Sequence, residues 1–153
     1  MRLDWNKTLP EGYSAMLGLQ KVVDQSSIDH KLLELVKIRA SQINGCAHCL
    51  DMHTKDAIAI GETEQRIHLL AAWREATFYS PRERAALDWC EALTQISENN
   101  APDRIYSEIE SLFSPRELVE LTLAIVVING WNRLAVGFRS PVGSYVSNKK
   151  HEK

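Results

Sequence analysis

The chain has 153 residues with a formal net charge of −2, and 44% of them are apolar, which fits one soluble domain spanning residues 1–153. Lys and Arg number 18 against 20 Asp and Glu, so no surplus of positive charge is available to bind a nucleic acid backbone. The longest uninterrupted apolar run, Leu123 to Ile128, is less than half of the roughly 20 residues that cross a membrane, and the N-terminus lacks the apolar core of a secretion signal.

These features predict a cytoplasmic protein with reduced thiols and without a nucleic acid or membrane partner.

Between residues 26 and 140, apolar side chains recur every three or four positions, which predicts an all-α fold, a bundle of about six to seven helices. Two copies of Ser-Pro-Arg-Glu, beginning at Ser80 and Ser114, are typical of capped helix starts. The expected helices cover residues 26–44, 46–60, 63–73, 80–99, 105–112 and 114–137.

The last expected helix is apolar on nearly every side between Leu121 and Ile128. In a soluble chain such a segment is enclosed by other helices or by another subunit, so we expect an oligomer. Beyond this helix, Lys149 to Lys153 is expected to be a frayed polar tail.

The three cysteines are too few for a disulfide framework, but two of them stand close together in Cys46-Ala47-His48-Cys49. In a reducing compartment, such a pair is typical of a redox-active or a metal-binding site. The third, Cys90, lies beside Trp89 on an apolar stripe and is expected to be a packing residue.

At 100° per residue, Cys46, Cys49 and His53 share the apolar, inward face of the second expected helix, whereas His48 points away. Both cysteines lie in the first turn, where the positive end of the helix dipole stabilises a thiolate. His53 follows Cys49 by one turn and can take the thiol proton. The residues on this face therefore predict a nucleophilic cysteine thiol with His53 as its base. Zinc binding by the cysteines and histidines stays open as an alternative.

Glu34 has two interpretations. In a hairpin that turns at Gly45, Glu34 lies nearly level with His53. Periodicity nevertheless places Glu34 opposite the apolar stripe of its own helix, beside Lys37 and Ser41, and so predicts a solvated side chain. Arg39 shows the opposite anomaly, because it lies on the apolar stripe, and we expect it in a buried ion pair or capping carbonyl groups.

The run from Glu34 to His53 resembles the active-site motif of the alkylhydroperoxidase AhpD-like family, within the carboxymuconolactone decarboxylase superfamily. The resemblance continues through Thr54 to Gly61, Trp73-Arg74-Glu75 and Ile128 to Leu134. It implies an all-helical oligomer, either a homotrimer or a homohexamer. It also implies a protein that reduces organic hydroperoxides and hydrogen peroxide through its cysteine pair, without a bound cofactor or metal.

Carried onto this sequence, the resemblance implies that Cys49 is the peroxidatic cysteine and Cys46 the resolving one. It makes Glu34, His48 and His53 a proton relay, which requires Glu34 to be buried. An external dithiol would reopen the disulfide, as a lipoylated protein does in the best-known members. Two alternatives remain: a lactone decarboxylase of the same superfamily, whose members lack this cysteine pair, and a non-enzymatic redox-sensing or zinc-stabilised module.

Overall fold

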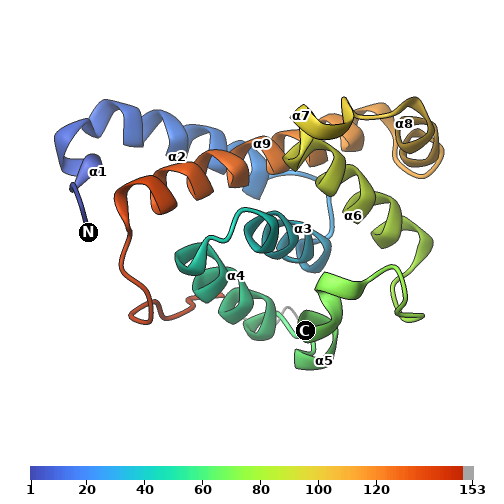
Figure 1. Cartoon of the computed structure of the whole chain (residues 1–153), viewed down its shortest axis with the longest axis horizontal. Coiled ribbons are helices and arrows are strands. Elements are labelled where there is room, and N and C mark those ends of the chain that lie inside the picture. The colour runs from blue at the N-terminus through green and yellow to red at the C-terminus, as the bar shows by residue number, and fades with distance from the viewer. Residues whose placement is uncertain (150–153) are drawn as a thin grey trace.

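The computed structural model describes residues 1–149, and within that range the chain is all-α, as predicted (Figure 1). The described residues form nine α-helices and one 3₁₀ helix. They are α1 (Trp5–Thr8), α2 (Pro10–Asp24), α3 (His30–Ile43), α4 (Ala47–Ala59), α5 (Glu64–His68), η1 (Leu69–Ala72), α6 (Pro81–Thr94), α7 (Ile96–Asn99), α8 (Asp103–Glu110) and α9 (Pro115–Phe138).

The prediction of six to seven helices was too low, chiefly because it omitted the N-terminal helices α1 and α2. Helix α2 has 15 residues, but Val23 is the one residue of it that is buried. Its inward stripe, Tyr13, Met16, Leu19 and Val23, has helical spacing, but the first three are only partly buried, and Leu17 and Val22 beside them are 44% and 51% exposed. The period was therefore present in the sequence, and the prediction omitted the helix because it considered only residues 26–140.

Local chemistry explains most of the other helix boundaries. The capping boxes at Ser80 and Ser114 are both present, with Glu83 and Glu117 as the third residue after each cap. Helix α3 begins later than predicted, because the Asp29 side chain, rather than Ser26 or Ser27, accepts a hydrogen bond from the Leu32 amide. The expected helix over residues 80–99 divides into α6 and α7, with a break at Gln95.

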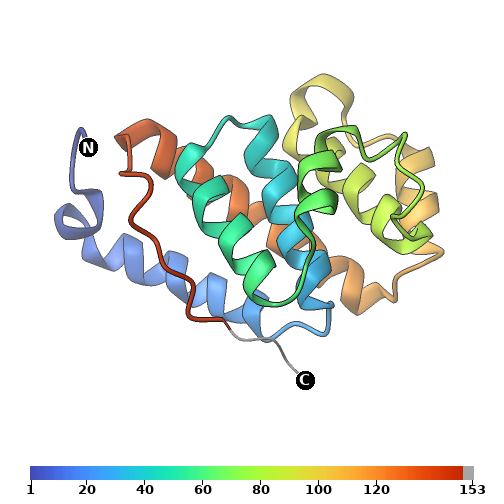
Figure 2. The same cartoon turned by 90° about the horizontal axis from the view of Figure 1, so that it is seen from below.

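Helix α3 lies at the centre of the molecule and packs against α4, α6 and α9. Gly45 adopts φ +63°, a left-handed conformation that glycine reaches without strain, so α4 can follow α3 after a very short turn. Helix α2 runs beside α9 (Figure 1). After α9, the chain crosses to α4 and continues between α4 and α2 (Figure 2).

Helix α9 supplies a large part of the core. Leu121, Ile125 and Ile128 are at most 2% exposed, whereas Val126 is 53% exposed. By length and composition alone, α9 could cross a membrane, a test that the core helix of a soluble protein also passes. Because α9 packs against α2, α3, α4, α6 and α8, we interpret it as a core helix.

Candidate functional site

The cysteine pair lies at the junction of α3 and α4. A disulfide joins Cys46 and Cys49, whose Cα atoms are 5.4 Å apart, and the two residues are 1% and 3% exposed. Cys46 is the N-cap of α4, and its Sγ accepts a hydrogen bond from the Cys49 amide at 3.3 Å. As predicted, both sulfurs therefore lie at the positive end of a helix dipole, which stabilises a thiolate when the bond is reduced.

A cavity of about 610 Å³ opens beside the pair. Cys49 and His53 both line it, whereas Cys46 does not. Another part of the wall comes from α1, α2 and α9 and combines aromatic and aliphatic side chains with polar ones such as Gln20 and Asp24. Its aromatic members include Trp5, Tyr13 and Trp131, whose neighbouring ring centroids lie 5.5–6.1 Å apart. Burial of an organic molecule against such rings is favourable.

Glu34 is 1% exposed, so the prediction of a solvated side chain from periodicity was wrong and the buried position implied by the resemblance is confirmed. His53 Nδ1 donates to Glu34 Oε2 at 2.8 Å, which leaves Nε2 of a neutral imidazole free to accept a proton. Glu34 Oε1 accepts from Lys37 Nζ at 3.0 Å and from Lys149 Nζ at 2.6 Å.

These partners explain the ionisation of Glu34. Burial alone would raise the pKa of the Glu34 carboxyl. The hydrogen bond from His53 and the charges of Lys37 and Lys149 instead hold that pKa well below its ordinary value. Glu34 is therefore a carboxylate at neutral pH, and it fixes the ring orientation and the tautomer of His53.

The polar face of α3 continues to the C-terminal half of α9. Ser41 is fully buried, and its hydroxyl accepts from Asn132 Nδ2 at 3.0 Å. Asn44, at the end of α3, donates to Asn129 Oδ1 and to Asn132 Oδ1. Asn129 and Asn132 belong to the Ile128 to Leu134 segment of the resemblance. They hold the end of α3, and with it the turn before Cys46, against α9.

His48 is the site residue that lies apart. Its Nδ1 donates to the Pro141 carbonyl at 2.6 Å, rather than to Glu34 or His53. It also lines the cavity, although periodicity placed it on the opposite side of α4 from Cys49. The structure thus brings Cys46, Cys49, His53 and Glu34 together, and the relay role of His48 stays a prediction.

Asp56 was missed at the sequence level, although a signal for it exists. It follows Cys49 by seven residues, two helical turns, and therefore lies on the same face of α4. Asp56 is 4% exposed and accepts from the hydroxyls of Tyr145 and Ser147 at 2.8 and 2.6 Å. Glu34, His53 and Asp56 form a cluster in which one side-chain oxygen or ring nitrogen from each residue lies within 4.8 Å of the other two.

Two other predictions are confirmed. Arg39 forms a part-buried ion pair with Glu91 at 2.7 Å. Cys90 is fully buried and free, and burial raises the pKa of its thiol to about 12, so it stays protonated and unreactive at neutral pH.

The prediction of a frayed C-terminal tail over Lys149 to Lys153 needs correction, because Lys149 is anchored to Glu34. Residues 150–153 lie outside the described residues.

Fold and site together define an AhpD-like, all-α protein with a cysteine pair at a helix N-terminus. The carboxymuconolactone decarboxylase family model matches residues 10–92. The chain belongs to this family.

Its relatives include the uncharacterized protein YdfG of Bacillus subtilis, 44% identical over 94% of this chain and 97% of YdfG. A solved structure of ATU0492 from Agrobacterium tumefaciens, a protein of unknown function with a suggested AhpD antioxidant-defence role, is also 44% identical. It matches with a TM-score of 0.90 over 94% of this chain and 99% of that one. The debrominase Bmp8 has a TM-score of 0.80 at 21% identity, covering 90% of this chain and 74% of its own, and shares the fold.

Proposed function

We propose that the protein is a thiol-dependent peroxidase that reduces organic hydroperoxides through Cys49. The observation that carries the proposal is the cavity, because Cys49 and His53 face it together and Cys46 does not. The cysteine with access to a substrate is thus the one that the resemblance makes peroxidatic. A volume of about 610 Å³ far exceeds the space that hydrogen peroxide needs, so the cavity favours an organic hydroperoxide.

The first step cleaves the peroxide. The Cys49 thiolate attacks the distal oxygen of R–O–OH, the O–O bond breaks, and Cys49 becomes a sulfenic acid while RO⁻ leaves. His53, held by Glu34 through Nδ1, takes the Cys49 proton on Nε2 and returns it to RO⁻, which departs as ROH. Sulfur loses two electrons and the peroxide gains them.

The second step forms the disulfide that the structure contains. The Cys46 thiol attacks the sulfenic sulfur of Cys49, and the sulfenic oxygen leaves as water. An external dithiol then reduces the disulfide by exchange and becomes a disulfide itself. The chain needs no bound cofactor for this cycle, and a lipoylated protein is a reductant of the required chemistry.

Separate single-cysteine variants test the proposal. Cys49→Ser is expected to abolish dithiol-dependent reduction of cumene hydroperoxide, because it removes the nucleophile. Cys46→Ser is expected to consume about one equivalent of peroxide and then stop, with a sulfenic acid on Cys49 that dimedone traps and mass spectrometry locates. Cys90→Ala is the matched control and should turn over like the wild type. Unchanged turnover by Cys49→Ser would refute the proposal.

A further inference from the structure

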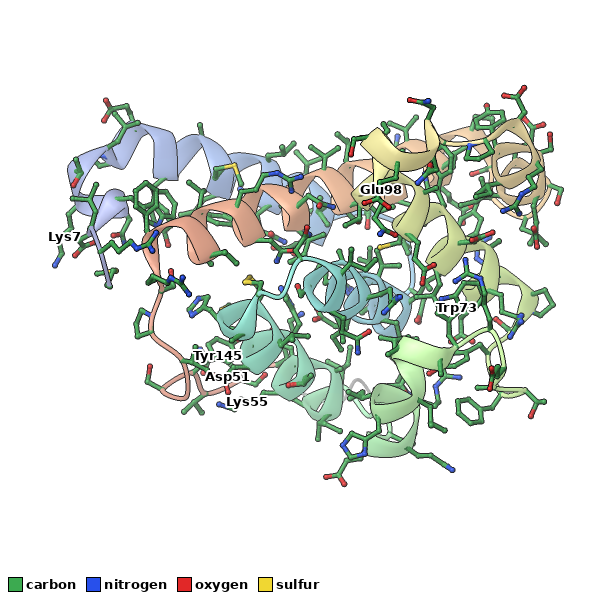
Figure 3. All side chains as sticks on the ribbon, viewed as in Figure 1. Lys7, Asp51, Lys55, Trp73, Glu98 and Tyr145 are labelled. Atoms are coloured by element: carbon green, nitrogen blue, oxygen red, sulfur yellow. A yellow bond between two sulfur atoms is a disulfide. The ribbon has the colours of Figure 1, made fainter. Side chains whose placement is uncertain are left out.

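The segment that follows α9, residues 140–149, which we call the C-terminal strap, lies on α4 in an extended conformation (Figure 2). Polar contacts with α4 hold it. Asp51 Oδ2 accepts from the Gly143 amide at 3.0 Å, and Lys55 Nζ donates to the Tyr145 carbonyl at 3.0 Å. Figure 3 shows Asp51, Lys55 and Tyr145 gathered on this side of α4.

Alternate side chains of the strap point toward the site. Tyr145, Ser147 and Lys149 turn inward, whereas Val146, which lies between Tyr145 and Ser147, is 76% exposed. This two-residue period is typical of an extended chain with one face against the protein. The inward side chains all end on Asp56 or Glu34, so the strap is aligned with the two buried carboxylates.

Asp56 obtains its side-chain partners from the strap. The hydroxyl groups of Tyr145 and Ser147 donate hydrogen bonds to Asp56 Oδ1. Lys149 Nζ lies 3.6 Å from Asp56 Oδ2. A buried carboxylate without partners is costly, so Asp56 favours a docked strap. Docking in turn brings the Lys149 ammonium to 2.6 Å from Glu34 Oε1, and Lys149 also lines the cavity.

We propose that Lys149 is a positioning residue: the strap carries its ammonium group to Glu34, where it sets the charge balance around the Cys49–His53 pair. The inference rests on the proposed function in assigning the nucleophile to Cys49 and the base to His53. Asp56 is the anchor that holds the strap in register. Neither Lys149 nor Asp56 was a candidate at the sequence level.

Charged and titratable groups reach the pair from several segments. Asp4 and Lys7 at the N-terminus and His48 on α4 line the same cavity as Cys49 and His53. Lys37 on α3 and Lys149 on the strap face Glu34, while Asp56 on α4 faces Lys149. Tyr145 adds a neutral hydroxyl, and Asp24 on α2 lies close enough to Lys149 to act on its charge. Burial would lower the pKa of Lys149, but Glu34 and Asp56 raise it above its ordinary value, so Lys149 stays an ammonium ion at working pH.

Among the groups in direct contact, and with His53 neutral, the two ammonium groups of Lys37 and Lys149 balance the carboxylates of Glu34 and Asp56, and Asp24 adds a further negative charge outside these contacts. Loss of Lys149 makes the charge beside Cys49 and His53 more negative by one. Excess negative charge favours bound protons, so the pair would release its first proton only at a higher pH. At a given pH below that point, less Cys49 thiolate would be available for attack.

The test measures the pH dependence of alkylation of the reduced protein by iodoacetamide, with the modified cysteine identified by peptide mass spectrometry. This readout follows the thiolate and needs no peroxidase activity, so it can fail or succeed independently of the proposed function. Lys149→Met should move the acid limb of the Cys49 profile upward by about 0.5 pH unit, or about threefold in rate at fixed pH, a shift limited by partial exposure of Lys149.

Two further variants separate charge from structure. Lys149→Arg keeps the cation and should restore the wild-type profile. Lys55→Gln is the matched control, because it removes the same charge from a residue that contacts the strap but not Glu34, and it should leave the acid limb in place. The proposal is overturned if Lys149→Met lowers the rate equally at all pH values, if the limb does not move, or if Lys149→Arg and Lys55→Gln both behave like Lys149→Met.

Discussion

Helices α3 and α4 meet at the site, but they differ in how their amphipathic patterns relate to burial. On α4 the apolar face carries Cys49 and His53, and it is the face turned toward the protein interior. On α3 the apolar face is buried, but so is the polar face that carries Glu34, Lys37 and Ser41, which are at most 5% exposed. Hydrophobic pattern therefore located the site on α4 and misplaced Glu34 on α3.

The difference follows from the position of the two helices. Helix α3 is surrounded by α4, α6 and α9, so every residue from Leu32 to Ile38 is buried, whichever way its side chain points. A polar stripe on such a helix needs polar partners, and here His53, Lys149 and Asn132 supply them. A helix that is amphipathic in sequence but central in the fold thus gathers polar groups from several elements. That is the environment in which proton transfer can be controlled.

The largest stability effect is expected from Glu34→Gln. The variant keeps the shape of the side chain but leaves the ammonium of Lys37, which is 5% exposed, without its carboxylate partner. We expect a loss of about 3 kcal/mol in the free energy of unfolding at pH 7, measured by urea denaturation. Turnover should fall about 100-fold, because His53 loses the negatively charged partner that fixes its tautomer and stabilises its protonated form. A loss of only a few tenths of a kcal/mol, as at an exposed glutamate, would indicate that the Glu34 side chain is solvated, as periodicity predicted.

The pH dependence of the same variant sharpens the comparison. Because the pKa of Glu34 lies below its ordinary value of 4.5, its stabilising contribution is complete above that value and is lost as the pH falls toward the pKa of the folded state. The difference in unfolding free energy between wild type and Glu34→Gln should therefore shrink between about pH 4.5 and pH 2.5. An equal difference at pH 7 and pH 3 would show that Glu34 stabilises the fold without its charge.

The parts of the fold that could be predicted are those with local causes. The capping boxes at Ser80 and Ser114 and the glycine turn at Gly45 act within a few residues, and the structure contains all three. The strap could not be predicted, because its contacts join residues 89 to 115 positions apart in the sequence. An extended segment with one polar inward face has no apolar period to reveal it. Asp56 had a local signal, but its role depends on the strap.

Helix α9 offers the converse of α3, since apolar residues on it are exposed. Val119 and Val126 lie two turns apart and are 59% and 53% exposed, in agreement with a face that another subunit covers. We expect light scattering at micromolar concentration to give a multiple of the 17.3 kDa chain mass, and Val126→Lys to shift it toward 17.3 kDa. Leu69→Lys, at an exposed apolar residue of η1, is the control and should not change the mass. A monomeric wild type would contradict the oligomer.

The smallest effect is expected from Cys90→Ala, which tests whether position alone separates a structural from a reactive thiol. Cys90 is fully buried and donates to the Val36 carbonyl at 3.4 Å, so the variant should lose about 1 kcal/mol in unfolding free energy. With its pKa raised to about 12, only about 10⁻⁴ of the Cys90 thiol is ionised at pH 8. Iodoacetamide should therefore modify Cys49 in the reduced native protein and reach Cys90 only after denaturation. Alkylation of Cys90 at a comparable rate would mean that the helix N-terminus does not confer the reactivity of Cys49.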